Sequence, residues 1–342
     1  MHSEYAVRSL REDEYDRWTQ FVAKCPSGSL FALPVYLDIL CQATGGRFEV
    51  TGVFRGNELV GGVALYFERT PLGLVVTPRA LLSYNGPVIR DFADSKPAAR
   101  ISRQAAILLA LRNYLNHVPC AELILAARHP ISDIRPFVGG GWLVSPSYTY
   151  LVDIEDLPAA WARIDQNQRR LIDRAESLGL GCTEDDDYDS FFRLHFAVHA
   201  RKQSPLYLPE AAYKQYLARL KANDLCRLYH ARLPDDQAVA TQLVLTGPHH
   251  VSHTVCAGSD AGYLATGANP FLRWRSFTAL AGLGYHTNDL TGAPYPHELS
   301  RFKGQLGGTL LINWRISRTP TFAFRLRRKA FRLVRQFGRR IR

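Results

Sequence analysis

The chain of 342 residues has little that would hold a metal, a disulfide framework or a membrane span. Its six cysteines are scattered and no two of them form a CxxC pair, so the clustered ligands of a zinc site are lacking and we expect no metal. Scattered cysteines are typical of reduced, mostly buried thiols in a cytosolic protein. No run of about 18 apolar residues occurs, so we expect no membrane-spanning helix.

The first eleven residues also lack the apolar segment of a signal peptide. We therefore expect a cytoplasmic protein, with peripheral contact to the inner membrane face as a further expectation. The apolar fraction of 46% excludes disorder for most of the chain. The length allows two domains or one large one.

Acidic residues are missing from the last part of the chain, residues 318–342, which carries ten of the eleven net positive charges. Apolar residues recur there at steps of three and four between the arginines, which predicts a basic amphipathic helix. Such a helix suits peripheral contact with an anionic membrane, which we favour, or with the phosphates of tRNA. The structural alternative is a terminal helix packed on the body with solvated arginines.

The order of predicted elements occurs twice along the chain. The first series comprises helices at 12–24 and 34–41, strands at 48–54 and 59–67, extended pieces at 74–77 and 81–89, a helix at 97–117 and a strand at 122–126. The second comprises helices at 188–200 and 209–223, strands at 225–233, 238–245 and 250–256, a helix at 269–283 and a strand at 287–290. This recurrence predicts a duplicated domain.

We expect an N-terminal domain at 1–155, a C-terminal domain at 156–317 and the basic tail at 318–342. Residues 156–181 would link the domains through a helix over 161–180, with Gly179 and Gly181 at its end because helix C-termini often need positive φ.

Two segments resemble the Fem family of peptidyltransferases. Residues 169–180 are similar to the family's R-x-x-I-x-x-A-x-x-x-G run, and residues 289–308 are similar to its D-x-x-G strand end followed by F-K-x-x-L-G-G. The resemblance implies an α/β (α+β) fold of tandem acetyltransferase-like (GNAT) domains, each a mixed, mostly antiparallel sheet flanked by helices, with a substrate cleft between them. The chain lacks the heptads of the long helical hairpin that some Fem enzymes carry.

The same resemblance implies an acyltransferase. Fem enzymes transfer an activated acyl group, usually an aminoacyl ester on tRNA, to an amine, usually of a peptidoglycan precursor, and relatives act on exopolysaccharide sugars or small natural products. Such chemistry needs deprotonation of the amine, stabilisation of the oxyanion and positioning of both partners, without a covalent nucleophile. The sequence contains no G-x-S-x-G elbow.

Three residues are the catalytic candidates: Lys303, Asp289 and His253. Lys303, in the F-K motif, would stabilise the oxyanion or bind a phosphate or carboxylate; the alternative is a solvated lysine. Asp289 ends a predicted strand beside Gly292 and would orient the amine or act as a base, or else cap the next turn. His253 alternates with Val251 and Val255 on a strand and would act as a base, or else be a structural histidine.

Seven residues are the candidates for substrate binding: Arg169, Arg170, Arg174, Tyr84, Asn85, Glu298 and Phe302. The arginines suit bidentate phosphate contacts, or else form a solvated helix face. Tyr84 and Asn85 belong to a Y-N-G-P turn that borders the acceptor cleft in relatives, or else is a simple bend. Glu298 is a second carboxylate or a helix N-terminal charge, and Phe302 precedes Lys303 in its motif.

The donor is inferred from a missing loop. Acetyl-CoA enzymes hold the pyrophosphate in an R/Q-x-x-G-x-G/A loop, but here Leu306 takes the place of a small residue, and the helix predicted from Asn269 lacks a glycine-rich start. We expect no bound cofactor and an aminoacyl-tRNA donor, with acyl-CoA as the alternative. The expected partners are tRNA and a lipid- or nucleotide-linked cell-envelope precursor. A non-catalytic membrane or nucleic-acid binding protein is the remaining hypothesis.

Overall fold

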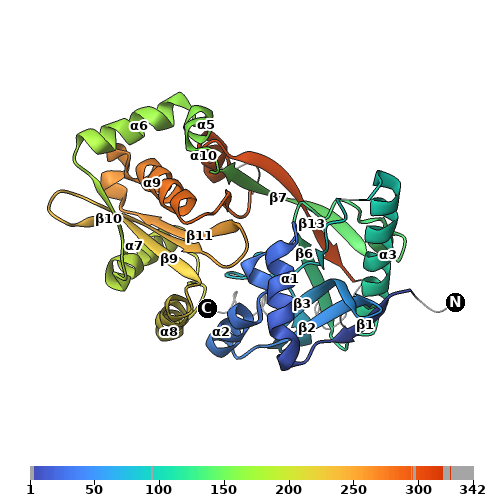
Figure 1. Cartoon of the computed structure of the whole chain (residues 1–342). Coiled ribbons are helices and arrows are strands. Elements are labelled where there is room, and N and C mark those ends of the chain that lie inside the picture. The colour runs from blue at the N-terminus through green and yellow to red at the C-terminus, as the bar shows by residue number, and fades with distance from the viewer. Residues whose placement is uncertain (1–3, 94, 294, 296–297, 319–323, 325–342) are drawn as a thin grey trace. The chain divides into compact units, whose positions relative to one another are not determined.

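Two compact units make up the computed structural model (Figure 1). The first contains residues 1–146 and 313–342, and the second contains residues 147–312. The structure describes residues 4–93, 95–293, 295, 298–318 and 324. The expected boundaries at 155 and 317 differ from these, because the chain changes units within two strands, β7 (Leu143–Asp153) and β13 (Thr309–Ser317).

The first unit is a twisted sheet with helices packed on it. Its strands are β1 (Ala6–Ser9), β2 (Arg47–Arg55), β3 (Glu58–Thr70), β4 (Gly73–Val76), β5 (Val88–Ile89) and β6 (Glu122–Ala127), and its helices are α1 (Tyr15–Lys24), α2 (Pro34–Thr44), α3 (Pro97–Asn116) and α4 (Arg135–Val138). The sheet order is β1-β2-β3-β4-β6-β13, and β5 pairs with β3. Among the described strand pairs of this unit, only β4 and β6 pair in parallel.

The core of the first unit follows from the apolar face of α3. Ile107, Leu108, Leu111 and Leu115 recur at helical spacing and are fully buried against strand residues such as Val63. Their burial excludes water from the centre of the sheet, which is the main favourable contribution to folding.

The second unit repeats this order of elements. Its helices are α5 (Leu157–Arg163), α6 (Gln166–Ser177), α7 (Tyr188–Arg201), α8 (Glu210–Ala222), α9 (Ala268–Gly282) and α10 (Glu298–Gln305), and its strands are β8 (Gly181–Glu184), β9 (Cys226–Arg232), β10 (Ala238–Leu245), β11 (Val251–Ser259) and β12 (Thr287–Asp289). The sheet order is β8-β9-β10-β11-β12-β7. The predicted mixed, mostly antiparallel sheet with flanking helices is confirmed.

A short parallel pairing between β11 and β12 sets the geometry of the site. The two strands pair only from Val251 opposite Thr287 to His253 opposite Asp289, and then they diverge. Helix α9 covers one face of the sheet, where Gln242 donates to Ser276 on α9. Helices α7 and α8 cover the other face, where Tyr213 of α8 contacts Cys256 of β11 (Figure 1).

The prediction of a single linking helix over 161–180 is wrong, because two helices occupy this region. The backbone of Ile164 is extended between α5 and α6, and Asp165 begins α6 by accepting a hydrogen bond from the Asn167 amide. Gly179 ends the region with φ of +75°, as expected. Gly181 instead begins strand β8, which was missed together with β1, β7 and β13.

Among the described residues, no helix is long and apolar enough to cross a membrane. Most of the expected basic tail lies outside the described residues. Its first cation, Arg318, binds to the first unit. The guanidinium donates to the carbonyls of Leu115, in the last turn of α3, and of Val118 and Cys120, just after the helix. A cation at a helix C-terminus is electrostatically favourable.

Two glycines in the second unit provide a matched test of the packing of α9. Gly267 and Gly284 flank this helix and have φ of +83° and +86°. A Cβ at Gly267 would lie 2.1 Å from the carbonyl oxygen of Leu171 in α6, whereas a Cβ at Gly284 would meet nothing within 4 Å. Gly284→Ala should cost about 1 kcal/mol for the left-handed backbone alone, and Gly267→Ala more than about 3 kcal/mol. Urea denaturation measures both, and equal losses would contradict the close approach.

Candidate active site

A pocket of about 420 Å³ lies where β11 and β12 diverge. Every lining residue belongs to the second unit. Strand β11 contributes Thr254 to Ala257 on one side, and the turn after β12 contributes Leu290 to Gly292 on the other. The pocket therefore begins directly after the last paired residues, His253 and Asp289. The remaining lining residues come from α7 and the loop after it, from α9 and from α10: His195, Val198, His199, Lys202, Ser204, Pro205, Tyr207, Arg273, Leu299 and Lys303.

Lys303 reaches this pocket from α10 and is 8% exposed. Its ammonium group donates to the carbonyls of Leu290 at 2.6 Å and Gly292 at 2.7 Å, and to that of Thr291 between them. An ammonium group has three donors, so all three are used by the backbone. Lys303 therefore fixes the turn after β12 and brings a positive charge to the pocket, while its own donors are occupied.

Burial lowers the pKa of Lys303 to about 8, because the charged amine loses its hydration. The positive charges of Arg273 on α9 and Lys202 after α7 lower it further, and Asp289 opposes them.

Asp289 and His253 face each other across the paired part of β11 and β12, with His253 Nδ1 and Asp289 Oδ2 3.5 Å apart. Both are almost fully buried, and neither lines the pocket. Asp289 Oδ1 accepts from the Thr149 hydroxyl at 2.5 Å and the Thr291 amide at 2.8 Å, so the carboxylate ties β7, β12 and the following turn together. The structure thus brings the three catalytic candidates close together, but only Lys303 reaches the pocket.

Two other histidines line the pocket. His195 and His199 are spaced four residues apart on α7 and lie on one face, with ring centroids 4.5 Å apart. Asp187 begins this helix by accepting from the Ser190 amide. Burial lowers the pKa of His195 to about 4, so this ring is neutral at neutral pH. The Nδ1 of His199 lies 3.0 Å from the Ser204 hydroxyl.

Cys256 is the thiol of the pocket, and it is poorly suited to covalent catalysis. Burial raises its pKa to about 12, and the Tyr213 hydroxyl lies 3.1 Å from its sulfur. A thiol with this pKa is not the nucleophilic thiolate near neutral pH. All six cysteines are free, as expected. Within the described part of the chain, no group of three or more His, Cys, Asp or Glu could hold a metal ion.

The other predicted residues of the second unit lie away from the pocket lining. Arg170 and Arg174 are on the exposed face of α6, and Arg169 is half-buried there. Glu298 is exposed at the start of α10. Phe302 packs against the apolar core of the unit.

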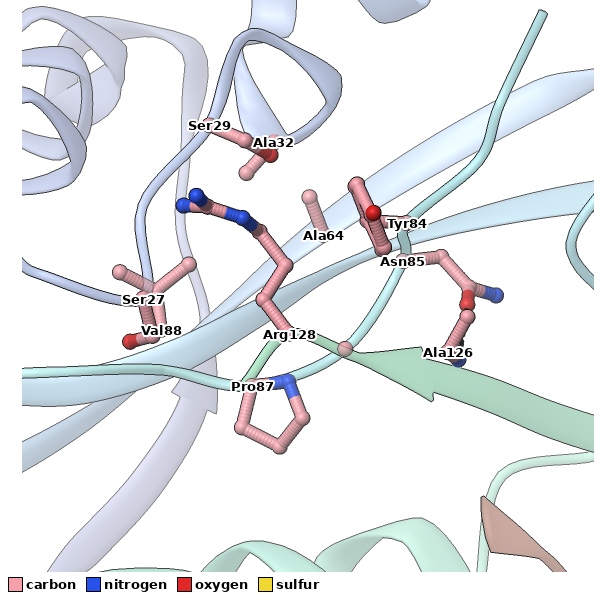
Figure 2. Close-up of a pocket in the computed structure, with 11 residues that line it drawn as sticks. Ser27, Ser29, Ala32, Ala64, Tyr84, Asn85, Pro87, Val88, Ala126 and Arg128 are labelled. Carbon is pink, nitrogen blue, oxygen red and sulfur yellow. Dashed lines mark hydrogen bonds between the residues drawn. The ribbon is translucent and has the colours of Figure 1, made fainter. Parts of the chain in front are cut away.

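Tyr84 and Asn85 lie in the first unit, in a turn held against β6 (Figure 2). The Asn85 side chain donates to the carbonyl of Ile124 and accepts from the amide of Ala126, and the Tyr84 hydroxyl accepts from Asn313. The cavity beside them measures only about 10 Å³ and is bordered by the buried Arg128, which donates to the carbonyl of Gly28. This volume is about that of one water molecule. The hydrogen bonds of the turn to β6 therefore give it a structural role, which is to stabilise the sheet.

The residues that sequence reasoning missed are Arg273, His195 and His199. The signal for Arg273 is present, since it lies four residues before Phe277 and seven before Leu280, on the apolar face of α9. His195 and His199 continue a four-residue spacing that begins at Phe191, so the sequence pattern places them on the same face of α7 as this buried aromatic residue.

The protein family described as the acetyltransferase (GNAT) domain matches residues 162–303 of the sequence. These residues include the whole pocket lining. No curated protein sequence matches the chain. Among solved structures, that of FemX is similar with a TM-score of 0.71 at 12% identity, covering 91% of this chain and 96% of the other.

Two further structures share the fold over almost the whole chain. The C-terminal domain of a putative lysylphosphatidylglycerol synthetase from Agrobacterium fabrum has a TM-score of 0.56 at 13% identity, covering 93% of this chain and 96% of the other. A tandem GNAT protein from the clavulanic acid biosynthesis pathway has a TM-score of 0.52 at 13% identity, covering 92% and 97%.

The matched domain and the pocket inside it support an acyltransferase, and the similar structures show a GNAT-like fold over almost the whole chain. Residues 162–303 are its acetyltransferase-like domain, and the structure as a whole is similar to FemX and to a tandem GNAT protein.

The lowered pKa of Lys303 predicts a pH dependence of stability. The folded protein releases this proton near pH 8 and the unfolded chain near 10.5, so the cost of burying the cation is present below pH 8 and is removed as pH rises towards 10.5. The free energy of unfolding of the wild type, relative to Lys303→Met, should therefore rise over this range by up to about 3 kcal/mol. Urea denaturation at pH 7, 8, 9 and 10 measures the difference, and a constant value would contradict the burial of a charged amine.

Proposed function

We propose that the protein is a Fem-like N-acyltransferase that transfers an aminoacyl group from aminoacyl-tRNA to an amine of a cell-envelope precursor. The observation that carries the proposal is the pocket at the divergence of β11 and β12, inside the matched acetyltransferase domain. Beyond His253 no ladder pairing joins β11 to β12 in the described part of the chain, although the Thr291 hydroxyl donates to the carbonyl of Thr254, so the backbone N–H groups on this edge of β11 are suited to stabilise a developing oxyanion.

The start of α9 supports a donor other than acyl-CoA. GNAT enzymes that use CoA hold its pyrophosphate at the equivalent helix start, where backbone N–H groups face the anion. Here Gly267 is buried with its Cα directly against the carbonyl of Leu171, and Pro270 in the first turn has no N–H. A carbonyl of α6 therefore lies directly beside this helix start, and its first turn has one N–H group fewer to offer a pyrophosphate.

The reaction forms one C–N bond and breaks one C–O bond. The amine nitrogen attacks the ester carbonyl carbon, the ribose oxygen of the tRNA leaves and takes up a proton, and the amine loses one. His199 is suited to accept that proton when its Nδ1–H donates to Ser204, because Nε2 is then the free acceptor. Lys303 contributes positive charge beside the developing oxyanion and keeps the turn after β12 in place.

The names of two similar structures support an envelope acceptor. FemX and the C-terminal domain of a putative lysylphosphatidylglycerol synthetase share the fold. The second name refers to a phospholipid that carries an amino acid. A lipid- or nucleotide-linked acceptor, tRNA as partner, and peripheral contact with the inner membrane face through 318–342 complete the proposal. The ten positive charges of that segment suit either polyanion.

An acyl-CoA-dependent N-acyltransferase of exopolysaccharide or lipid-sugar synthesis is the second candidate. The tandem GNAT protein of the clavulanic acid pathway, whose title refers to AcCoA, favours it.

A transfer assay with two donors tests the proposal. The full chain is incubated with total tRNA charged with radiolabelled amino acids, or with labelled acetyl-CoA, and with UDP-linked muramyl peptides and lipid-linked precursors as acceptors. We expect label to move from tRNA to an acceptor as a base-stable amide. Transfer from acetyl-CoA alone would establish the second candidate, and a lack of transfer from either donor would contradict both.

His199→Gln should lower kcat by about 10²- to 10⁴-fold, the usual contribution of a general base. Its matched control is His117→Gln, an exposed histidine of the first unit that should leave kcat unchanged. The KM values of both variants should stay near wild type. Full activity of His199→Gln would exclude this histidine as the base.

A further inference from the structure

Arg273 is a buried cation, and two of its three guanidinium nitrogens have no hydrogen-bond partner among the described residues. It lies on α9, 7% exposed, and lines the pocket. Its Nε and Nη1 have no hydrogen-bond partner among the described residues, and no carboxylate there forms an ion pair with it. Burial lowers the pKa of its guanidinium to about 10. Since nearly all buried polar groups are paired, and a buried unpaired charge is costly, this arrangement requires explanation.

The charged residues that line the pocket all have one sign. Lys202 and Lys303 also line the pocket, and no Asp or Glu is among its lining residues in the described part of the chain. The nearby carboxylate of Asp289 is already held by Thr149 and by the Thr291 amide. An anion entering this pocket would therefore meet three positive charges.

The free donors distinguish Arg273 from Lys303. The ammonium group of Lys303 is saturated by three carbonyls, whereas the guanidinium of Arg273 keeps a planar fork of N–H groups. Such a fork matches the two oxygens of a carboxylate or phosphate. His195 adds to the same pocket a neutral ring whose two nitrogens also lack partners among the described residues, so one N–H is free to donate to a bound group.

The remaining walls show what kind of molecule would bring the anion. Val198, Pro205, Tyr207, Leu290 and Leu299 line the pocket with largely apolar surface, and its volume of about 420 Å³ lies within the range of small-molecule sites. The geometry points to a subsite in which Arg273, assisted by His195, binds the carboxylate or phosphate of an organic substrate. This assignment of a substrate class rests on the proposed function, whereas anion binding itself does not.

Anion-dependent thermal stability of the full chain tests the subsite. Inorganic phosphate and acetate are the probes, each compared with chloride at equal ionic strength, and isothermal titration gives the affinity. The variants are Arg273→Met, Arg273→Lys and the control Arg275→Met, which removes an exposed arginine of the same helix that pairs with Glu176. The wild type and Arg275→Met should gain Tm with at least one probe.

Arg273→Met should lose this gain and bind the probe at least about tenfold more weakly, the loss expected for one charge-assisted hydrogen bond. In chloride its Tm should equal or exceed that of the wild type, because an uncompensated buried charge has been removed. Arg273→Lys should keep the charge but lose the fork and bind with intermediate affinity. The probe that acts at lower concentration identifies phosphate or carboxylate as the preferred group.

Three results would overturn the subsite: no stabilisation of the wild type by either probe, equal stabilisation of wild type and Arg273→Met, or failure of both Arg273 variants to fold, which would make the residue structural. Anion binding without aminoacyl transfer would contradict the proposed function alone. Aminoacyl transfer with no anion effect would contradict the subsite alone.

Discussion

Positive charge buried beside the divergence of two strands is the constraint on which the second unit depends. Strands β11 and β12 pair over only three residues, and the space that opens beyond them is lined by the buried Arg273 and Lys303 and by the exposed Lys202. The protein compensates the charge of Lys303 with three carbonyls of the turn that follows β12. The same contacts fix the position of that turn, which Thr291 also links to β11 by donating to the carbonyl of Thr254, so the lysine that lines the pocket also helps to shape it.

The fold places these groups by ordinary packing. Helix α7 brings two histidines to the pocket on one helical face, α9 brings Arg273 on its apolar face, and α10 brings Lys303. The buried pair of Asp289 and His253 lies just before the divergence and, with Thr149, joins β7, β11 and β12. The pocket residues Thr254 and Leu290 thus directly follow the supporting residues His253 and Asp289 in the chain, and this closeness explains why their roles are hard to separate in sequence.

Sequence periodicity was sufficient for the repeated order of elements, since α3 and α9 each show an apolar helical face and the hairpins β2–β3 and β9–β10 each surround a polar turn. Strands β7 and β13 were not predicted, because their half-exposed residues show no clear alternation of polar and apolar side chains. Their pairing also depends on partners far away in the chain. Lys303 was recognised from a motif, whereas the use of its three donors depends on tertiary structure. His253 lies two residues after Val251 on β11, so the two side chains share a face of the strand, and the expectation that His253 faces opposite to this valine is wrong. The strand pattern also does not tell a pocket from a buried interface, and His253 is fully buried beside Asp289.

The position of a bound donor analogue tests the account most directly. A crystal structure of the full chain with a stable amide-linked aminoacyl-adenosine analogue should show the aminoacyl group between β11 and β12, in contact with the unpaired edge of β11 and close to Lys303. Density at another place, such as the start of α9 beside Leu171, would contradict the assignment of this pocket to acyl transfer.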